Sequence, residues 1–304
     1  MGSMMEIMKK VRDEGDAPDP AVEGVVEPMP ENAARDASGP GAAGSRFTQS
    51  GPEAVSDLVA EAASVAFPST QEWNAKLIDR AVVAFHARYS VECEQFRSIR
   101  ARLLSMNSGG APCVLAITSS VPGEGKSTCT VNLGIVMAEG GEQRTLIVDA
   151  DLRRASITRM LGLDGQSGLS DLLRGTSSVK QHVYPTPFAK LKVLPAGAAC
   201  GASQSELLGS ARLREVFTEL RAAFDYVFVD MPPVSTVADA SVLGPRCDAA
   251  LLVLQMHRTP EPVAQQAVRT LQANKVRVLG CILTRHHERH AHMYDINEYY
   301  NYGS

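Results

Sequence analysis

A ten-residue stretch in the first half of the chain has glycines, a lysine and hydroxyl side chains in an order suited to binding phosphate. Residues 119–128 read SSVPGEGKST and follow a short apolar run. The glycines let the backbone approach a ligand closely. Lys126 supplies a positive charge to phosphate groups, and the Ser127 hydroxyl is suited to ligate Mg²⁺. The sequence therefore predicts a nucleotide site formed by Gly123, Glu124, Gly125, Lys126, Ser127 and Thr128.

Two later segments each place carboxylates directly after an apolar run. Residues 146–154 read LIVDADLRR, and residues 226–233 read YVFVDMPP. Asp149 and Asp151 are two positions apart, so in extended geometry their side chains face the same way. Carboxylates that end parallel strands point into the crevice where nucleotides bind. We therefore expect Asp149, Asp151 and Asp230 beside the phosphate loop, with Asp230 holding Mg²⁺ directly or through water.

The elements that must position these residues alternate along the chain from residue 111 onward. Near-continuous apolar runs separated by helical patterns indicate a parallel sheet that is buried on both faces. The prediction is an α/β protein with the P-loop NTPase fold, a mostly parallel central sheet flanked by helices and a single catalytic domain. The expected strands are 113–118, 145–150, 191–196, 226–231, 249–256 and 276–283; the expected helices are 127–140, 210–224 and 261–274.

Charge and composition divide the chain into three parts. Of its 304 residues, 1–65 contain 5 Lys or Arg and 12 Asp or Glu, while the rest contain 25 and 22. Such an acidic segment, rich in Pro and Gly, buries too little apolar area to fold. We predict a largely disordered acidic leader over 1–68, a catalytic domain over 69–285 and a flexible His- and Tyr-rich tail over 286–304. The domain includes a helical segment, 72–105, that breaks near Tyr89 and Ser90.

Composition also excludes several classes of protein. A net charge of −4 argues against a nucleic-acid binder. No apolar run near the core approaches the roughly 20 residues of a membrane-spanning helix, and the first residues lack the apolar stretch of a secretion signal. The six cysteines form no CxxC pair, which favours reduced thiols and a cytoplasmic protein.

Taken together and in this order, the motifs resemble those of the bacterial tyrosine kinases of capsule and exopolysaccharide export. The resemblance covers about residues 88–304 and has five parts. They are the phosphate loop, LIVDADLRR, VFVDMPP, a helical E-x-x-R-x-x-R motif and a C-terminal tyrosine cluster, YDINEYYNYGS. The motif residues are Glu94, Arg97 and Arg100; the cluster contains Tyr294, Tyr299, Tyr300 and Tyr302.

The resemblance implies an ATP- and Mg²⁺-dependent protein-tyrosine kinase that phosphorylates its own tyrosine cluster in trans between subunits. Lys126 would bind the β- and γ-phosphates, and Asp149 would position or deprotonate the tyrosine hydroxyl. Ser127, Asp151 and Asp230 would surround Mg²⁺. Either Arg153 or Arg154 could also hold phosphate. The cluster tyrosines would be the phosphate acceptors.

The resemblance further implies a set of partners. The E-x-x-R-x-x-R motif would join subunits into a ring when the tail is unphosphorylated, although ion pairs on a solvated helix face are the usual alternative. The two fused membrane helices of one family branch are absent here. A separate membrane co-polymerase would therefore activate the kinase at the inner face of the plasma membrane, and a cognate tyrosine phosphatase would reverse its reaction.

Four positions depart from the family pattern: Ser120 at the first loop glycine, Ala155 after the double arginine, Met231 before Pro-Pro, and Thr284 where an Asn often contacts the base. Two alternative functions stay open, namely an ATPase switch of the MinD/ParA type and a scaffold that ATP binding assembles without kinase activity. The segment 285–292, RHHERHAH, is expected to be a weakly basic linker rather than a metal site.

Overall fold

The computed structural model describes residues 75–140, 142–198, 204–235 and 239–285. The leader predicted over 1–68 and the tail predicted over 286–304 both lie outside these residues, as does the tyrosine cluster. The three-part division of the chain therefore stays a prediction.

All six predicted strands are confirmed, and they form the centre of a seven-stranded sheet of order β3-β4-β2-β5-β1-β6-β7. The phosphate loop follows β1, which lies between β5 and β6, and every pairing is parallel except that of β3 with β4. The strands are β1 Cys113–Ser119, β2 Thr145–Asp149, β3 Tyr184–Pro185, β4 Leu191–Leu194, β5 Tyr226–Asp230, β6 Ala249–Gln255 and β7 Val278–Thr284. β1, β2, β5 and β6 are apolar along almost their whole length because helices cover both of their faces.

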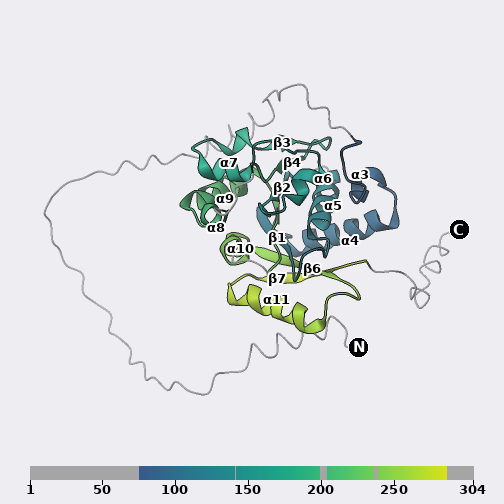
Figure 1. Ribbon diagram of the computed structural model, residues 1–304. Helices are drawn as coiled ribbons and strands as arrows, with labels where there is room; N and C mark the ends of the chain where they lie inside the picture. Colours follow the sequence, from purple (N-terminus) through teal and green to yellow (C-terminus); the bar gives the residue numbers. More distant parts are fainter. Residues whose placement is uncertain (1–74, 141, 199–203, 236–238, 286–304) are drawn as a thin grey trace, which may run out of the picture. The chain divides into compact units, whose positions relative to one another are not determined.

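The three helices predicted between the strands are also confirmed, as α5 Lys126–Glu139, α9 Ala211–Ala223 and α11 Glu261–Ala273. In Figure 1, α3 to α6 lie on one side of the central strands and α7 to α9 on the other, while α11 lies beside β7. The remaining short elements are α6 Ser156–Met160, α7 Leu169–Arg174, η1 Val179–Gln181, α8 Gln204–Leu208, α10 Asp239–Leu243 and η3 Gly244–Arg246. No apolar period marks such short turns, and the sequence did not predict them.

The helical segment predicted over 72–105 is helical mainly in its second half, and the break predicted near Tyr89 and Ser90 is confirmed. Turns lead into the four-residue helix α3, Val83–His86, and a second break precedes α4, Val91–Met106. The turns before α3 are held by the Asn132 side chain of α5. It donates to the Ala81 carbonyl at 3.0 Å and accepts from the Ala84 N–H at 2.8 Å. The break before α4 is explained by Ser90, whose hydroxyl caps α4 by accepting from the Cys93 N–H.

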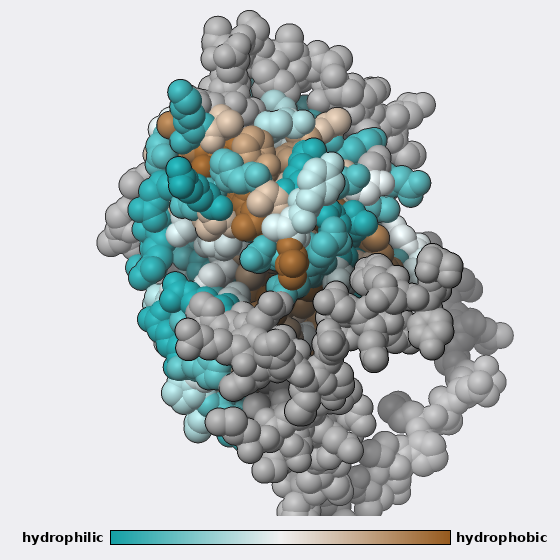
Figure 2. All heavy atoms as spheres, turned by 90° about the vertical axis from the view of Figure 1, so that its right-hand side faces the viewer, coloured by the Kyte–Doolittle hydropathy of each residue, from teal (hydrophilic) through white to brown (hydrophobic). Residues whose placement is uncertain are grey.

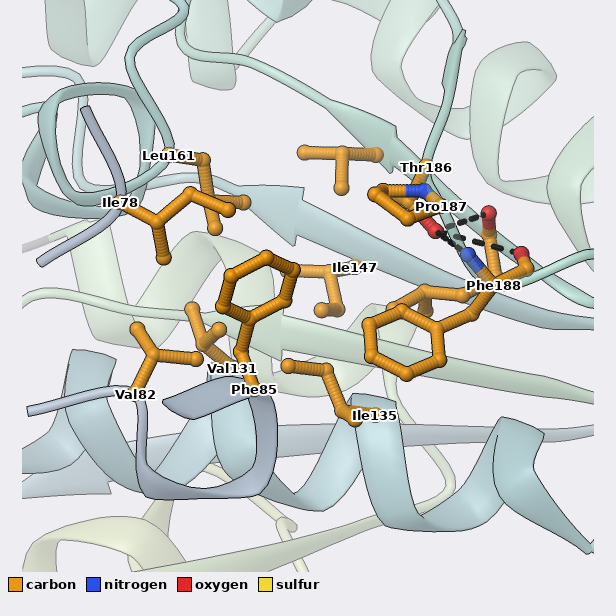
Figure 3. A pocket seen from close by; sticks show the side chains of 12 residues that line it. Ile78, Val82, Phe85, Val131, Ile135, Ile147, Leu161, Thr186, Pro187 and Phe188 are labelled. Atoms are coloured by element: carbon orange, nitrogen blue, oxygen red, sulfur yellow. Dashed lines mark hydrogen bonds between the residues drawn. The ribbon is translucent and has the colours of Figure 1, made fainter. Parts of the chain in front are cut away.

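The segment that contains α3 packs onto the sheet and α5 through apolar side chains. Ile78 and Val82 are buried, and the rings of Phe85 and Phe188 meet edge to face with centroids 6.3 Å apart. Figure 3 shows these side chains around a small apolar cavity that also receives Val131 and Ile135 from α5. The cavity holds about 10 Å³, which is room for no more than one water molecule. It is a packing gap in the core and not a ligand site.

The outer surface over α3 and α4 is mixed in character. Figure 2 shows brown apolar surface bordered by teal hydrophilic residues on the side that α3 and α4 occupy in Figure 1. Among the described residues, no helix combines the length and the apolar character needed to cross a bilayer.

Candidate active site

The phosphate loop connects β1 to α5 through two glycines in left-handed backbone conformations. Gly123 has φ 86° and Gly125 has φ 95°, values that L-residues with a Cβ rarely adopt. α5 then begins at Lys126, and the first N–H groups of a helix have no partner within the helix itself. The loop and the helix start therefore have the geometry of an anion site.

Three carboxylates predicted from different segments come together beside this loop. In the register of the sheet, Asp149 of β2 is the direct neighbour of Asp230 on β5. The Lys126 ammonium lies 2.8 Å from Asp151 Oδ2 and 3.2 Å from Asp230 Oδ2. The Ser127 hydroxyl donates to Asp230 Oδ2 at 2.6 Å. The predicted residues Lys126, Ser127, Asp149, Asp151 and Asp230 thus form one buried cluster.

Burial and mutual charge shift the pKa values within this cluster. Burial alone would lower the pKa of Lys126, but the charges of Asp230 and Asp151 outweigh it and hold that pKa above its usual value. Burial also raises the pKa of Asp230, against the opposing effects of Lys126 and Ser127. Burial, followed by the charge of Asp230, raises the pKa of Asp149 to about 7. Asp149 can therefore accept a proton near neutral pH more readily than an ordinary carboxylate.

Thr158 holds Asp149 in place, a role that no sequence pattern indicated. Asp149 Oδ2 accepts from the Thr158 N–H at 2.9 Å and from its hydroxyl at 2.8 Å. The same hydroxyl accepts from the Ala196 N–H at 3.0 Å. Asp149 Oδ1 is buried and has no hydrogen-bond partner among the described residues. One oxygen of Asp149 is thus fixed by α6, and the other is unpaired.

The donor set fits Mg²⁺. Ser127, Asp151 and Asp230 offer only oxygen atoms, which this hard cation prefers, and Mg²⁺ usually binds through one or two carboxylates together with substrate phosphates. The orphaned Asp149 Oδ1 is a further oxygen at the same place. With the metal and nucleotide bound, Lys126 would exchange its carboxylate partners for phosphate.

Glu124, expected to bind nucleotide, has its side chain engaged elsewhere. Its carboxylate accepts from the Val121 N–H at 2.8 Å, from the Gln255 N–H at 3.4 Å and from the Thr259 hydroxyl. The Glu124 carbonyl accepts from the Thr284 hydroxyl at 2.7 Å. Glu124 therefore ties the loop to the ends of β6 and β7, and only its backbone is left for a ligand.

Two hollows flank the loop. The first, of about 460 Å³, runs from residues of the loop, including Thr128, to the α6 segment, where Arg154, Ser156, Arg159 and Met160 line it. The second, of about 450 Å³, lies between the loop, α4 and the end of β7, and Thr284 lines it. The first hollow contains Lys126 and Ser127, so it is the one where phosphates would lie.

The E-x-x-R-x-x-R motif lies on α4, and its arginines bind α5 of the same chain. Arg97 pairs with Glu94 and, at 3.1 Å, with Glu139 at the end of α5. Arg100 donates to the Val136 carbonyl at 2.8 Å. The side chain of Glu94 is 62% exposed, whereas that of Arg97 is 23% exposed. The arginines therefore hold α4 against α5, and a role in joining subunits stays a prediction.

Comparison with known proteins agrees with this site. Residues 113–275 match the family described as the AAA domain. The chain is 35% identical over 206 residues to the tyrosine-protein kinase YwqD of Bacillus subtilis, covering 68% of this chain and 86% of YwqD. The chain belongs to the bacterial tyrosine kinase family. The prediction of a protein-tyrosine kinase built on a P-loop NTPase fold is thereby confirmed.

Another relative is much longer than this chain, and its name refers to polysaccharide biosynthesis and transport. The chain is 33% identical to the succinoglycan biosynthesis transport protein ExoP of Rhizobium meliloti, but it spans only 26% of that protein and covers 67% of its own length. Among solved structures, the BceF tyrosine kinase domain superposes with a TM-score of 0.60 at 32% identity, covering 66% of this chain and 81% of that domain.

The predicted alternative of a MinD-type switch corresponds to a more distant likeness. The septum site-determining protein MinD of Pyrococcus horikoshii, in complex with Mg-ADP, superposes with a TM-score of 0.50 at 27% identity, covering 57% of this chain and 70% of MinD.

Proposed function

We propose that this kinase uses Mg·ATP to phosphorylate the tyrosines of its C-terminal segment, in trans between copies, and thereby regulates polysaccharide polymerisation or export. The observation that carries the proposal is the buried cluster in which Lys126 bridges Asp151 and Asp230 while one oxygen of Asp149 has no hydrogen-bond partner among the described residues. The names of the relatives, which are tyrosine kinases and a polysaccharide transport protein, support the same process.

Each residue of the cluster has its own role in phosphoryl transfer. Lys126 and the loop N–H groups bind the phosphates, and Ser127, Asp151 and Asp230 hold Mg²⁺, which neutralises charge on the transferred group. Asp149 would accept a hydrogen bond or a proton from the tyrosine hydroxyl through its unpaired oxygen, Oδ1. Since a free tyrosine has a pKa of about 10, Asp149 contributes mainly by positioning the hydroxyl.

The membrane and assembly partners are also proposals. A membrane protein of the polysaccharide export machinery would bring the kinase to the inner face of the membrane and activate it. Unphosphorylated copies would form a ring through Glu94, Arg97 and Arg100. Phosphate adds about −1.5 to −2 charges per tyrosine, so a phosphorylated tail would favour dissociation. A cognate tyrosine phosphatase would restore the ring.

The test is a phosphotyrosine assay on the full chain with Mg·ATP. Wild type is compared with Asp149→Asn, with a version truncated after Met293, and with Asp164→Asn as a matched control on an exposed surface carboxylate. We expect signal in wild type and control only. ATP hydrolysis without phosphotyrosine, also when the membrane partner's cytosolic segment is added, would favour the MinD-type switch. Signal that survives truncation would refute the tail as the main acceptor.

A further inference from the structure

The hollow that contains Lys126 is bordered by three exposed arginines with free guanidinium groups. Arg154 precedes α6, Arg159 lies within it, and Arg285 follows β7. None of the three side chains makes a hydrogen bond or ion pair within the described part of the chain. The one acidic residue on the same lining, Asp79, accepts from the nearby Ala81 N–H at 2.8 Å. These arginines therefore make the wall of the hollow that they line positively charged, and no described residue pairs with them.

α6 connects these arginines to the chemistry of the site. Thr158, which fixes Asp149 Oδ2 through its N–H and hydroxyl, is the direct neighbour of Arg159. Arg154 is four residues before Thr158, and its own N–H is bonded to Asp151. A tyrosine whose hydroxyl lies at Asp149 would thus have its neighbouring residues close to Arg154 and Arg159.

Two kinds of negative charge could occupy this wall. Nucleotide phosphates have the loop, the start of α5 and Lys126 as their own partners. The other candidate is the acceptor segment, whose sequence carries acidic side chains. Residues 293–304, MYDINEYYNYGS, contain Asp295 and Glu298 among four tyrosines and contain no Lys or Arg. Charge complementarity therefore favours the acceptor segment of a second copy.

We infer that Arg154 and Arg159 select the acceptor by binding the acidic side chains that flank its tyrosines. The inference rests on the proposed function and deepens it, since it assigns substrate specificity to α6 and not to the phosphate loop. Guanidinium groups suit this task because they bind carboxylates through paired hydrogen bonds.

The experiment measures transfer to a peptide of residues 293–304 by a full chain whose four tail tyrosines are replaced by Phe. A second peptide carries Asp295→Asn and Glu298→Gln. We expect the double variant Arg154→Ala/Arg159→Ala to raise KM for the acidic peptide about five- to tenfold, the size of two exposed charge contacts. KM for ATP and transfer to the neutral peptide should stay within about twofold. Arg214→Ala, an exposed arginine on α9, is the matched control.

Reversing the charges on both the peptide and the kinase tests whether phosphate transfer can be restored. A peptide with Asp295→Lys and Glu298→Lys should be a poor acceptor for wild type and a better one for Arg154→Glu/Arg159→Glu. Equal losses for acidic and neutral peptides, or a raised KM for ATP, would overturn the inference, because the arginines would then serve the nucleotide or the fold.

Binding of the same fluorescent peptides, measured by anisotropy with Mg²⁺ and a non-hydrolysable ATP analogue, separates this inference from the proposed function. Charge-dependent binding without phosphate transfer would refute the kinase reaction on this tail and keep the docking role of the arginines. Binding that ignores peptide charge would refute the docking role, whatever the result for transfer.

Discussion

Replacing Lys126 by Met tests whether the buried cluster depends on one charge for its stability. The Lys126 side chain is 8% exposed, and those of its partners Asp151 and Asp230 are 2% and 0% exposed. Methionine has nearly the same length and removes only the ammonium group. Without a positive charge, the buried carboxylates can remain together only if one of them takes up a proton.

The cost of that proton gives the expected magnitude. An ordinary Asp has a pKa of about 3.9, and each pH unit above it costs about 1.4 kcal/mol to keep the group protonated. The variant should therefore lose about 4 kcal/mol of unfolding free energy at pH 7 and about 1.5 kcal/mol at pH 5. The value at pH 7 agrees with the roughly 3–5 kcal/mol typical of breaking a buried pair.

The direction of the pH dependence follows from proton binding. In the variant, the folded protein holds a proton at pH values where the unfolded chain has released it. Stability must therefore fall as pH rises above the unfolded pKa, near 4, and continue to fall up to the raised folded pKa. Asp149 is present in both wild type and Lys126→Met. Most of its effect on the pH dependence of the unfolding free energy therefore cancels when the two proteins are compared.

Urea unfolding followed by circular dichroism, in EDTA at pH 5, 6, 7 and 8, measures this difference. Lys190→Met, at an exposed lysine, is the control and should change stability by less than about 0.5 kcal/mol at every pH. A Lys126→Met loss below about 1 kcal/mol at pH 7, or a loss of equal size at pH 5 and pH 8, would refute the reasoning.

The remaining predictions concern Asp149, its support, and the packing of α3 and α4. Asp149→Asn removes a carboxyl whose pKa is raised to about 7. In EDTA it should therefore stabilise the fold by about 1–3 kcal/mol at pH 8 and by almost nothing at pH 4, while phosphotyrosine formation is lost. A gain in stability that persists at pH 4 would contradict this. Thr158→Val removes the hydroxyl between Asp149 and Ala196 and should cost about 1–3 kcal/mol and lower kcat more than it raises KM for ATP, with Thr158→Ser as the rescuing variant. Phe85→Ala empties the space beside Phe188 shown in Figure 3 and should cost about 2–4 kcal/mol in urea unfolding without changing KM for ATP. Arg97→Ala should cost about 1 kcal/mol because Glu139, 16% exposed, loses a partner, whereas Glu94→Gln should cost almost nothing.

Much of the fold and the centre of the site could be predicted because the signals are local. Buried parallel strands are apolar over five to seven residues, as β1, β2, β5 and β6 show, and carboxylates at their ends meet at one edge of the sheet. The phosphate loop carries its own glycine pattern. Lys126, Ser127, Asp149, Asp151 and Asp230 were all expected, and the structure places them together.

The parts that sequence could not predict depend on contacts between distant segments. α6 has five residues and no apolar period, so neither the helix nor the role of Thr158 could be read from the sequence. The turns that lead into α3 depend on Asn132, which lies about 50 positions later and bonds the backbone groups of residues 81 and 84. Glu124 looked like a ligand of the nucleotide, but Gln255 of β6 and Thr259, in the bend between β6 and α11, engage its carboxylate.

Arg97 contacts α5 of its own chain and also belongs to the motif predicted to join subunits. A test of assembly must therefore separate these two roles. α5 is one helix of 14 residues with Lys126 at its first position and Glu139 at its last, and Arg97 binds that last residue. If the proposed ring forms, its loss in an Arg97 variant would follow either from a lost subunit contact or from lost packing of α4 on α5. Glu94 is exposed and contributes little to that packing, so its variant separates the two effects. Only a loss of assembly in Glu94→Gln, with unfolding free energy unchanged, would show that this face of α4 joins subunits.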